Sequence, residues 1–230
     1  MTNPALTTAR IEAIDDRAGA VRVLTLAPLT NFTWRAGQYA HLSLEGVDAR
    51  SFSIASAPGA DNRITFHIRN TGKGLSARLS EARIGDIISL EGPFGDMTTE
   101  HARNRPVIMV AGGTGIAPML SLASDILRRH LTEEGITLIY GARKDDDIYC
   151  RRELDTLLAT GEVSLHVVTG THTPDQELRR LGLNLAHHIA YLSGPDPMML
   201  PVRKVMLDHL ADPSRIFTDV RLEDLMKEQP

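Results

Sequence analysis

The side chains of this sequence that could bind phosphate lie in four short segments. The first is Arg50-Ser51-Phe52-Ser53, in which a guanidinium is followed by an aromatic ring and a hydroxyl. The planar fork of N–H donors in arginine suits a phosphate group. Phe52 adds an aromatic face and Ser53 a hydrogen-bonding group. The alternative is an ordinary strand whose arginine is solvated.

The second segment, Gly72-Lys73-Gly74-Leu75-Ser76, precedes a helix predicted at about 75–81. Glycine lets a ligand approach the backbone closely, and a helix N-terminus presents free N–H groups to an anion. We therefore interpret the segment as a second candidate phosphate site. The alternative is that Ser76 only caps the helix.

The third and fourth segments each follow a predicted strand. Gly112-Gly113-Thr114-Gly115 stands between a buried strand and a helix, which is the context of a dinucleotide-phosphate turn, and Pro118 suits the first helical turn. Ser193-Gly194-Pro195-Asp196-Pro197-Met198 also follows a strand, where ligands bind in open α/β sheets. Both could instead be turns without a ligand.

The first hundred residues predict a small antiparallel barrel that would position the first two segments. Short, partly alternating runs rich in β-branched residues are separated by turn signals, and one helix interrupts them at about 75–81. Such spacing is typical of a six-stranded β-barrel. The predicted strands are 8–15, 21–27, 39–44, 51–56, 64–68 and 86–91.

After residue 104 the pattern changes to alternating strands and helices. This alternation predicts right-handed βαβ units and a parallel sheet. The polar segment 98–105 separates the two patterns, so we expect two domains, 1–103 and 104–230. The predicted strands are 107–111, 137–141, 163–169, 189–193 and a candidate fifth, 215–218; the predicted helices are 119–130, 151–160 and 197–210.

Composition excludes several classes of protein. The net charge is −4 and no basic run stands out, so a nucleic-acid partner is not expected. No apolar run approaches the roughly 20 residues of a membrane helix, and the N-terminus lacks a signal-peptide pattern, so we expect a cytoplasmic protein without membrane insertion. The single cysteine, Cys150, is too few for an iron–sulfur cluster, which needs about four thiolates. The nine histidines show no metal-ligand spacing, so no metal is expected.

Taken in order, the four segments resemble the motifs of the ferredoxin–NADP reductase superfamily over about residues 8–220. Weaker echoes are Ala36-Gly37-Gln38-Tyr39, which resembles P-G-Q-Y, and Gly92-Pro93-Phe94-Gly95, which resembles G-P-x-G. The main motifs correspond as follows: R-x-[YF]-[ST] matches Arg50, Phe52 and Ser53; the flavin-phosphate turn matches Gly74 and Ser76; G-G-T-G-x-x-P matches Gly112, Gly113, Thr114, Gly115 and Pro118; and C-G-P-x-x-M matches Gly194, Pro195 and Met198.

The resemblance implies a barrel that binds FAD, with FMN possible, and an α/β domain that binds NADPH or NADH as co-substrate. It implies that Phe52 packs on the flavin ring, that Ser53 lies near the hydride-accepting atom N5, and that Ser53 and Ser193 are the catalytic candidates. Arg50 and Ser76 would hold flavin phosphates, and Gly112–Gly115 those of NAD(P)H. The remaining cofactor-binding candidates are Ile54, His67, Arg69, Leu75, Pro118, Arg143, Gly194, Pro195 and Met198.

Two positions depart from the family pattern. Ser193 stands where the family has a cysteine beside the nicotinamide. The aromatic that covers the flavin in many members would fall near Arg221, so that either Phe217 serves or the face is closed differently. On the nucleotide side, Arg143 and Lys144 could bind the 2′-phosphate of NADPH, although Asp145–Asp147 oppose an anion there. We favour NADPH.

Three functional hypotheses follow from the resemblance. The first is an FAD-dependent reductase that takes hydride from NAD(P)H and passes electrons to a separate ferredoxin, flavodoxin or oxygenase component. The second is an NAD(P)H:flavin reductase that releases reduced flavin. The third is a flavin-bearing relay or regulatory subunit of a larger complex.

Overall fold

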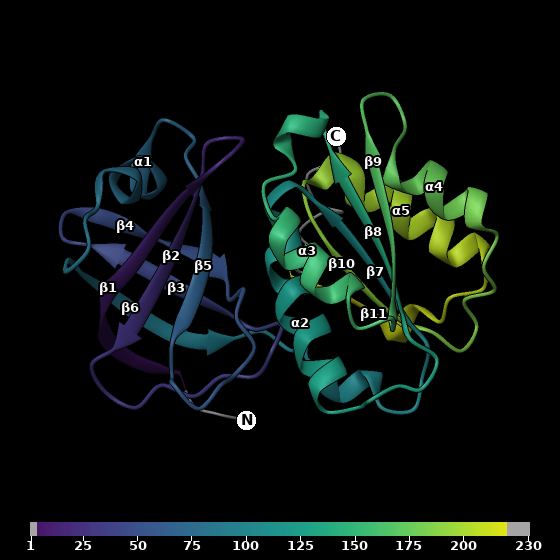
Figure 1. Cartoon of the computed structure of the whole chain (residues 1–230), viewed down its shortest axis with the longest axis horizontal. Coiled ribbons are helices and arrows are strands. Elements are labelled where there is room, and N and C mark those ends of the chain that lie inside the picture. The colour runs from purple at the N-terminus through teal and green to yellow at the C-terminus, as the bar shows by residue number, and fades with distance from the viewer. Residues whose placement is uncertain (1–3, 220–230) are drawn as a thin grey trace.

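A computed structural model of the chain describes residues 4–219, which form two β-sheets side by side (Figure 1). The first sheet is antiparallel and has the order β4-β3-β6-β1-β2-β5. Its strands are β1 (Ala5–Arg17), β2 (Val21–Pro28), β3 (Tyr39–Leu44), β4 (Val47–Ser53), β5 (Ile64–Arg69) and β6 (Ile87–Phe94), and helix α1 (Gly74–Glu81) packs at one end.

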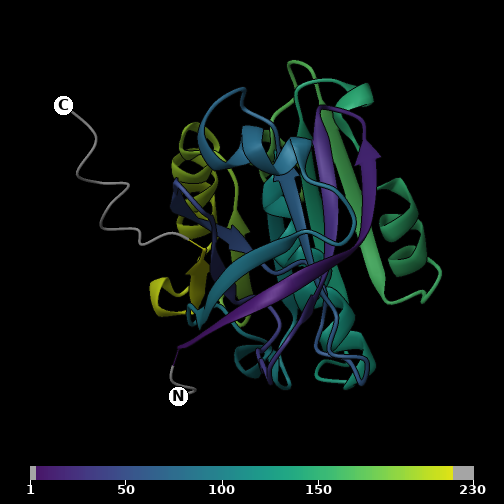
Figure 2. The same cartoon turned by 90° about the vertical axis from the view of Figure 1, so that its left-hand side faces the viewer.

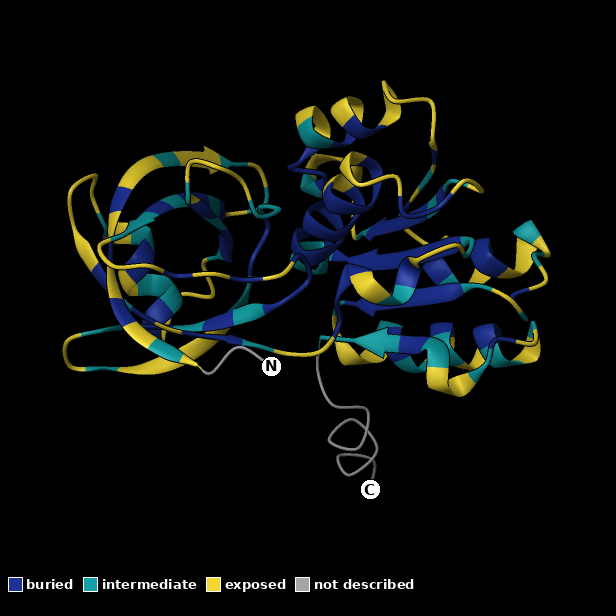
Figure 3. Ribbon diagram, turned by 90° about the horizontal axis from the view of Figure 1, so that it is seen from below, coloured by how far each residue is buried: buried dark blue, intermediate teal, exposed yellow. Residues whose placement is uncertain are grey.

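The first sheet curls into a barrel, and its strands alternate buried and exposed residues so that one face lines the core. Ala9 and Ile11 of β1 are buried, while Thr8 before them and Arg10 between them are exposed, so one face meets the core. The long β1 bends across the barrel in the view of Figure 2, and its pairing with β2 shifts register between Ile11 and Ala13. Seen from below in Figure 3, the strands form a ring around buried residues.

One bridge joins the two edge strands of the barrel. Ile54, directly after β4, pairs with Phe66 of β5, and the Ala55 amide donates to the Thr65 carbonyl at 2.8 Å. This contact holds the end of β4 against β5. The ends of these two strands therefore lie next to each other.

The second sheet is parallel and has the order β11-β10-β7-β8-β9. Its elements are β7 (Val107–Gly112), α2 (Ile116–Arg128), β8 (Ile136–Ala142), α3 (Arg151–Leu158), β9 (Val163–Thr169), α4 (Pro174–Leu181), β10 (Ile189–Ser193), α5 (Asp196–Asp208) and β11 (Ile216–Thr218). Short 3-10 turns connect some of the elements described: η1 (Thr99–Ala102), η2 (Gly113–Gly115), η3 (Asp145–Asp147) and η4 (Pro213–Arg215).

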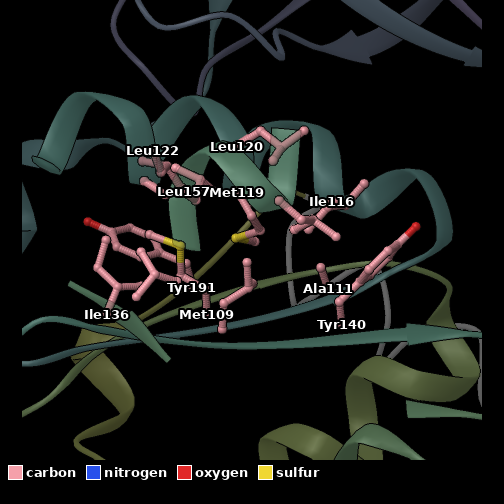
Figure 4. Packing of buried hydrophobic residues seen from close by; sticks show 14 of the residues in the cluster. Met109, Ala111, Ile116, Met119, Leu120, Leu122, Ile136, Tyr140, Leu157 and Tyr191 are labelled. Carbon is pink, nitrogen blue, oxygen red and sulfur yellow. The ribbon is translucent and has the colours of Figure 1, made fainter. Parts of the chain in front are cut away.

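Helices cover both faces of the second sheet, which explains why β7 is buried throughout. Met109 and Ala111 of β7 pack on the side of α2 and α3, as Figure 4 shows for Met109, Met119 and Ile116. Ile108 and Val110 face α4 and α5 instead. No helix among residues 4–219 is long and apolar enough to cross a membrane.

The predicted two-part fold is confirmed, including the six antiparallel strands and the fifth parallel strand. Most element bounds lie within three residues of the predicted ones, but two elements differ more. The strand predicted at 51–56 is β4, which begins earlier, at Val47, and ends at Ser53. Its start was missed because most residues of β4 are exposed and therefore show no apolar pattern in the sequence. Helix α4 was not predicted, since its eight residues are mostly polar; the capping box of Thr173 and Gln176 marks its start.

Candidate functional site

A cavity of about 830 Å³ opens between the two sheets. Side chains of β4 and β5 form one wall, and the turns after β7, β8, β9 and β10 form the other. Most of the predicted site residues meet there: Arg50, Phe52, Ser53, His67, Arg69, Gly112, Gly113, Thr114, Gly115, Arg143, Ser193, Gly194, Pro195 and Met198. Segments more than 100 residues apart in the sequence thus share one cavity.

Five predicted residues do not line this cavity. Ile54 and Leu75 are buried in the core of the barrel, and Pro118 is buried in α2. Gly74 and Ser76 lie at the start of α1, beyond Thr71, which does line the cavity. The Ser76 hydroxyl is 2.7 Å from that of Thr71, so the turn before α1 continues the cavity wall outward.

Two guanidinium groups at the cavity have no competing partner among the residues that the structure describes. Within residues 4–219, neither Arg50 nor Arg143 makes a side-chain hydrogen bond or ion pair. The aspartates after Arg143 are partly engaged elsewhere: Asp145 pairs with Arg151 at 2.7 Å and Asp146 with Lys144 at 4.0 Å. Both arginines are therefore available to an anion in the cavity.

The turn after β7 is packed so closely that only glycine fits. A Cβ at Gly115 would lie 2.3 Å from the carbonyl oxygen of Ser193, and one at Gly112 would lie 2.6 Å from Sδ of Met198. Gly113 has a φ of +56°, which a glycine adopts without strain. Among residues 4–219 no side chain caps the start of α2. The Ile116 N–H donates to the Thr114 carbonyl, and the N–H groups that follow it in the first turn remain available to a ligand. The turn fits a dinucleotide phosphate.

Ser193 is held in place by a hydrogen bond to Asp219. Its hydroxyl donates to the carboxylate of Asp219, and both residues line the cavity. Asp219 is a candidate that the sequence interpretation missed, because that interpretation sought an aromatic near Arg221. Arg221 itself lies outside the described residues.

Phe217 packs away from the cavity wall. Its ring stacks on His101, with centroids 3.8 Å apart, and lies 6.0 Å from the ring of Tyr191. It contacts the core on the α2 side of the second sheet. Phe217 is not among the described residues that line the cavity, which favours the other alternative, that this face of the flavin is closed differently.

Two buried tyrosines brace the cavity from behind. The Tyr140 hydroxyl of β8 donates to the Gly113 carbonyl at 3.2 Å, and the Tyr149 hydroxyl lies 2.9 Å from Nδ1 of His67. Burial raises the pKa of both phenols, so both keep their protons. Nothing in the local sequence around either tyrosine signals this role, because each partner lies far away in the chain.

Two further buried groups near the cavity, His67 and Cys150, are uncharged near neutral pH. Burial lowers the pKa of His67 to about 4 and raises the pKa of the Cys150 thiol to about 12. Cys150 is fully buried, which agrees with a structural cysteine. Among residues 4–219, no three His, Cys, Asp or Glu side chains are grouped so that they could hold a metal ion.

Two family models match the chain, one for each sheet. The model described as "Oxidoreductase FAD-binding domain" matches residues 12–99, and that described as "Oxidoreductase NAD-binding domain" matches residues 109–204. The gap between the two matches, residues 100–108, contains the end of η1 and the start of β7.

Curated relatives include reductase components of oxygenase systems. The ferredoxin–NAD(P)(+) reductase component of the naphthalene 1,2-dioxygenase system of Pseudomonas putida is 31% identical over 95% of this chain and 70% of its own length. Reductase component 1 of the terephthalate 1,2-dioxygenase of a Comamonas species is 31% identical over 76% of this chain, but the match spans only 55% of that relative.

Solved structures share the fold over nearly the whole chain. The Amycolatopsis cytochrome P450 reductase GcoB has a TM-score of 0.84 at 23% identity, covering 95% of this chain and 71% of the other. The flavohem-like FAD/NAD binding domain of nitric oxide dioxygenase from Vibrio cholerae has a TM-score of 0.82 at 22% identity, covering 94% and 98%. At these identities the likeness shows the fold alone.

Proposed function

Because the chain belongs to the ferredoxin–NADP reductase superfamily, we propose that it takes a hydride from NAD(P)H onto bound FAD and passes the electrons to a separate acceptor. The observation that carries this proposal is the shared cavity. Residues of the flavin motif on β4 face the glycine turn after β7 across a single space. A donor and an acceptor bound to these two walls would meet there.

On the barrel side, Arg50, Phe52 and Ser53 would hold the flavin. The uncommitted guanidinium of Arg50 suits a flavin phosphate, and Ser76 and Gly74 extend that contact at the start of α1. Phe52 is half-buried against the barrel core and offers its ring as a wall. When bound, the flavin would accept the hydride and release single electrons, and the side chains of this chain cannot do either.

On the α/β side, Gly112–Gly115 and the start of α2 would hold the phosphates of NAD(P)H. Ser193 would orient the nicotinamide, and its own orientation is fixed by the hydrogen bond to Asp219. Gly194, Pro195 and Met198 pack against the glycine turn and would form the floor. Arg143, free of the neighbouring carboxylates, supports NADPH as the preferred donor, with NADH as the alternative.

The acceptor that we propose is an oxygenase component or a small redox protein such as a ferredoxin or flavodoxin. The names of the relatives support an oxygenase system. We also propose a cytoplasmic location, and two domains, 1–103 and 104–230.

The test is an anaerobic reduction. We expect the purified protein to be yellow and its flavin band to bleach within seconds of adding NADPH or NADH, with colour restored by an oxygenase component or ferredoxin. A colourless protein that oxidises NAD(P)H only with added free flavin would support the flavin-releasing alternative. Bound flavin that neither nucleotide bleaches would contradict the proposal and favour a relay subunit.

A further inference from the structure

His67 and Tyr149 join the two sheets directly beneath the cavity. His67 lies on β5, and Tyr149 lies in the segment between β8 and α3. Nδ1 of the imidazole is 2.9 Å from the phenol oxygen, and the two rings meet edge to face with centroids 5.4 Å apart. The exposed fractions are only 7% for His67 and 5% for Tyr149, so this polar pair is shielded from bulk water.

The burial of this pair determines which nitrogen carries the imidazole proton. Within residues 4–219 the Tyr149 hydroxyl has no other hydrogen-bond partner, and a buried hydroxyl proton without an acceptor is costly. Tyr149 therefore donates to Nδ1. Desolvation is the main cause that lowers the pKa of His67 to about 4; Glu153 opposes it and Arg17 reinforces it. The ring is neutral near pH 7, so its one proton sits on Nε2.

The resulting Nε2–H donor has no partner within the described part of the chain, and His67 lines the cavity. The bridge between Ile54 and Phe66 sets the register: one residue further, Ser53 stands opposite His67. Opposed residues of antiparallel strands point to the same face, with Cβ atoms about 5 Å apart. The unused donor therefore lies beside the hydroxyl of Ser53.

We propose that His67 donates its Nε2–H to a pyrimidine carbonyl oxygen of the bound flavin, and that Tyr149 is a positioning residue that fixes this donor. The inference rests on the proposed function, since it needs a flavin whose N5 edge faces Ser53. The carbonyl at C4 is the acceptor next to N5. A donor at that oxygen stabilises the negative charge that spreads into the pyrimidine ring on reduction.

Three variants of the flavin-loaded protein test the contact. His67→Leu removes the donor at similar volume, His67→Gln keeps an N–H at the corresponding reach, and Tyr149→Phe removes only the group that orients the imidazole. We expect His67→Leu to release flavin about threefold to tenfold faster than the parent protein, in line with the loss of one hydrogen bond. His67→Gln should stay within about twofold, and the flavin absorbance band should shift in His67→Leu alone.

Nitrogen-15 NMR of the imidazole reads out the tautomer independently of turnover. We expect the His67 signals of the parent to show the proton on Nε2, and those of Tyr149→Phe to show a mixture of both tautomers. The His67→Gln spectrum assigns the signals by their absence. A merely structural role of Tyr149 would leave the tautomer unchanged.

Two results would overturn the inference: parent-like flavin release from His67→Leu, or a proton found on Nδ1 in the parent. If His67→Leu does not fold, a flavin-release rate of Tyr149→Phe equal to that of the parent, with scrambled tautomers, would likewise contradict it. A parent protein that binds no flavin at all would instead refute the proposed function, and the two failures are thus distinguishable.

Discussion

At the scale of single residues, the informative feature of the site is an arginine without a carboxylate. Arg17, Arg22 and Arg129 each pair with an acid within 3.1 Å. Arg50, at the cavity, has no such partner among residues 4–219. A guanidinium left unpaired beside a cavity is available to a phosphate, and this makes Arg50 the most direct test of where the flavin binds.

Arg50→Ala should weaken flavin binding by roughly tenfold to a hundredfold, because it removes a charge-assisted contact worth about 1.5–3 kcal/mol. Titration of the flavin-free protein with FAD measures the change. Arg10→Ala is the matched control, since Arg10 is exposed on β1 and does not line the cavity. An equal effect of both substitutions would place the phosphate elsewhere.

Glu177, a buried carboxylate on helix α4, provides a pH-dependent test. Two hydrogen bonds from Arg180, at 2.6 and 2.8 Å, are the main cause that lowers the pKa of Glu177 to about 2, and His172 acts in the same direction. The depressed pKa means that the carboxylate stabilises the fold fully above its ordinary value of 4.5. That stabilisation is lost as the pH falls from 4.5 towards 2.

Glu177→Gln should therefore destabilise the protein at pH 6, by about 1–3 kcal/mol for the lost charge-assisted hydrogen bonds, and much less near pH 2. Urea denaturation of both proteins across this range gives the difference. If the difference in unfolding free energy between variant and parent stayed constant from pH 6 to pH 2, the charge of the Glu177 carboxylate would not stabilise the fold.

At the scale of elements, the site depends on two turns that touch. The glycine turn between β7 and α2 lies against the turn between β10 and α5, with no room for a Cβ between them. The sequence predicted each turn by itself, because Gly-rich segments after strands are local signals. Their contact depends on β10 pairing with β7, although about 80 residues separate the strands in the chain.

Gly115→Ala should raise the KM for NAD(P)H at least about tenfold while flavin stays bound, because the new methyl group would push the Ser193 carbonyl out of place. Steady-state kinetics and the flavin absorbance report the two effects separately. In Gly59→Ala the new Cβ would meet only Oδ1 of Asp61, at 3.3 Å, so this exposed loop position is the control. An unchanged KM would mean that the turn tolerates displacement.

At the scale of the whole molecule, the two sheets are joined by a small number of specific contacts. Arg17 of β1 donates to both carboxylate oxygens of Glu153 at 2.9 and 3.0 Å, and also to the Tyr149 carbonyl at 3.2 Å. Val21 of the barrel packs into the core of the second sheet. These contacts between the sheets determine the width of the cavity, because the flavin wall and the nucleotide wall belong to different sheets.

A double-mutant cycle on Arg17→Ala and Glu153→Ala should give a coupling energy of about 1–2 kcal/mol, as for a partly buried bidentate pair. Fluorescence of Trp34, the one tryptophan, follows the barrel, while circular dichroism follows mostly the helices of the second sheet. We expect the unfolding transitions seen by fluorescence and by circular dichroism to coincide in the parent and to separate in the double variant. The Arg22–Asp16 pair, which lies within the barrel, is the control and should leave them coincident.

The sequence by itself determined the two-part fold and most of the cavity lining. Period-two strands, a strand–helix alternation and Gly-rich turns are encoded within a few residues of each other, so local patterns suffice to find them. Arg50, Gly112–Gly115 and Ser193 were identified in this way, and each lines the cavity.

Tertiary structure alone decided the partners of these residues. Ser193 meets Asp219, Tyr149 meets His67 and Arg17 meets Glu153 across 26, 82 and 136 positions of sequence, and no local pattern encodes such a meeting. It likewise decided that Ile54 and Leu75 face the barrel core, because the curl of a sheet determines which side of a strand is inside. A hydrogen bond depends on distance in space, and only the folded chain sets that distance.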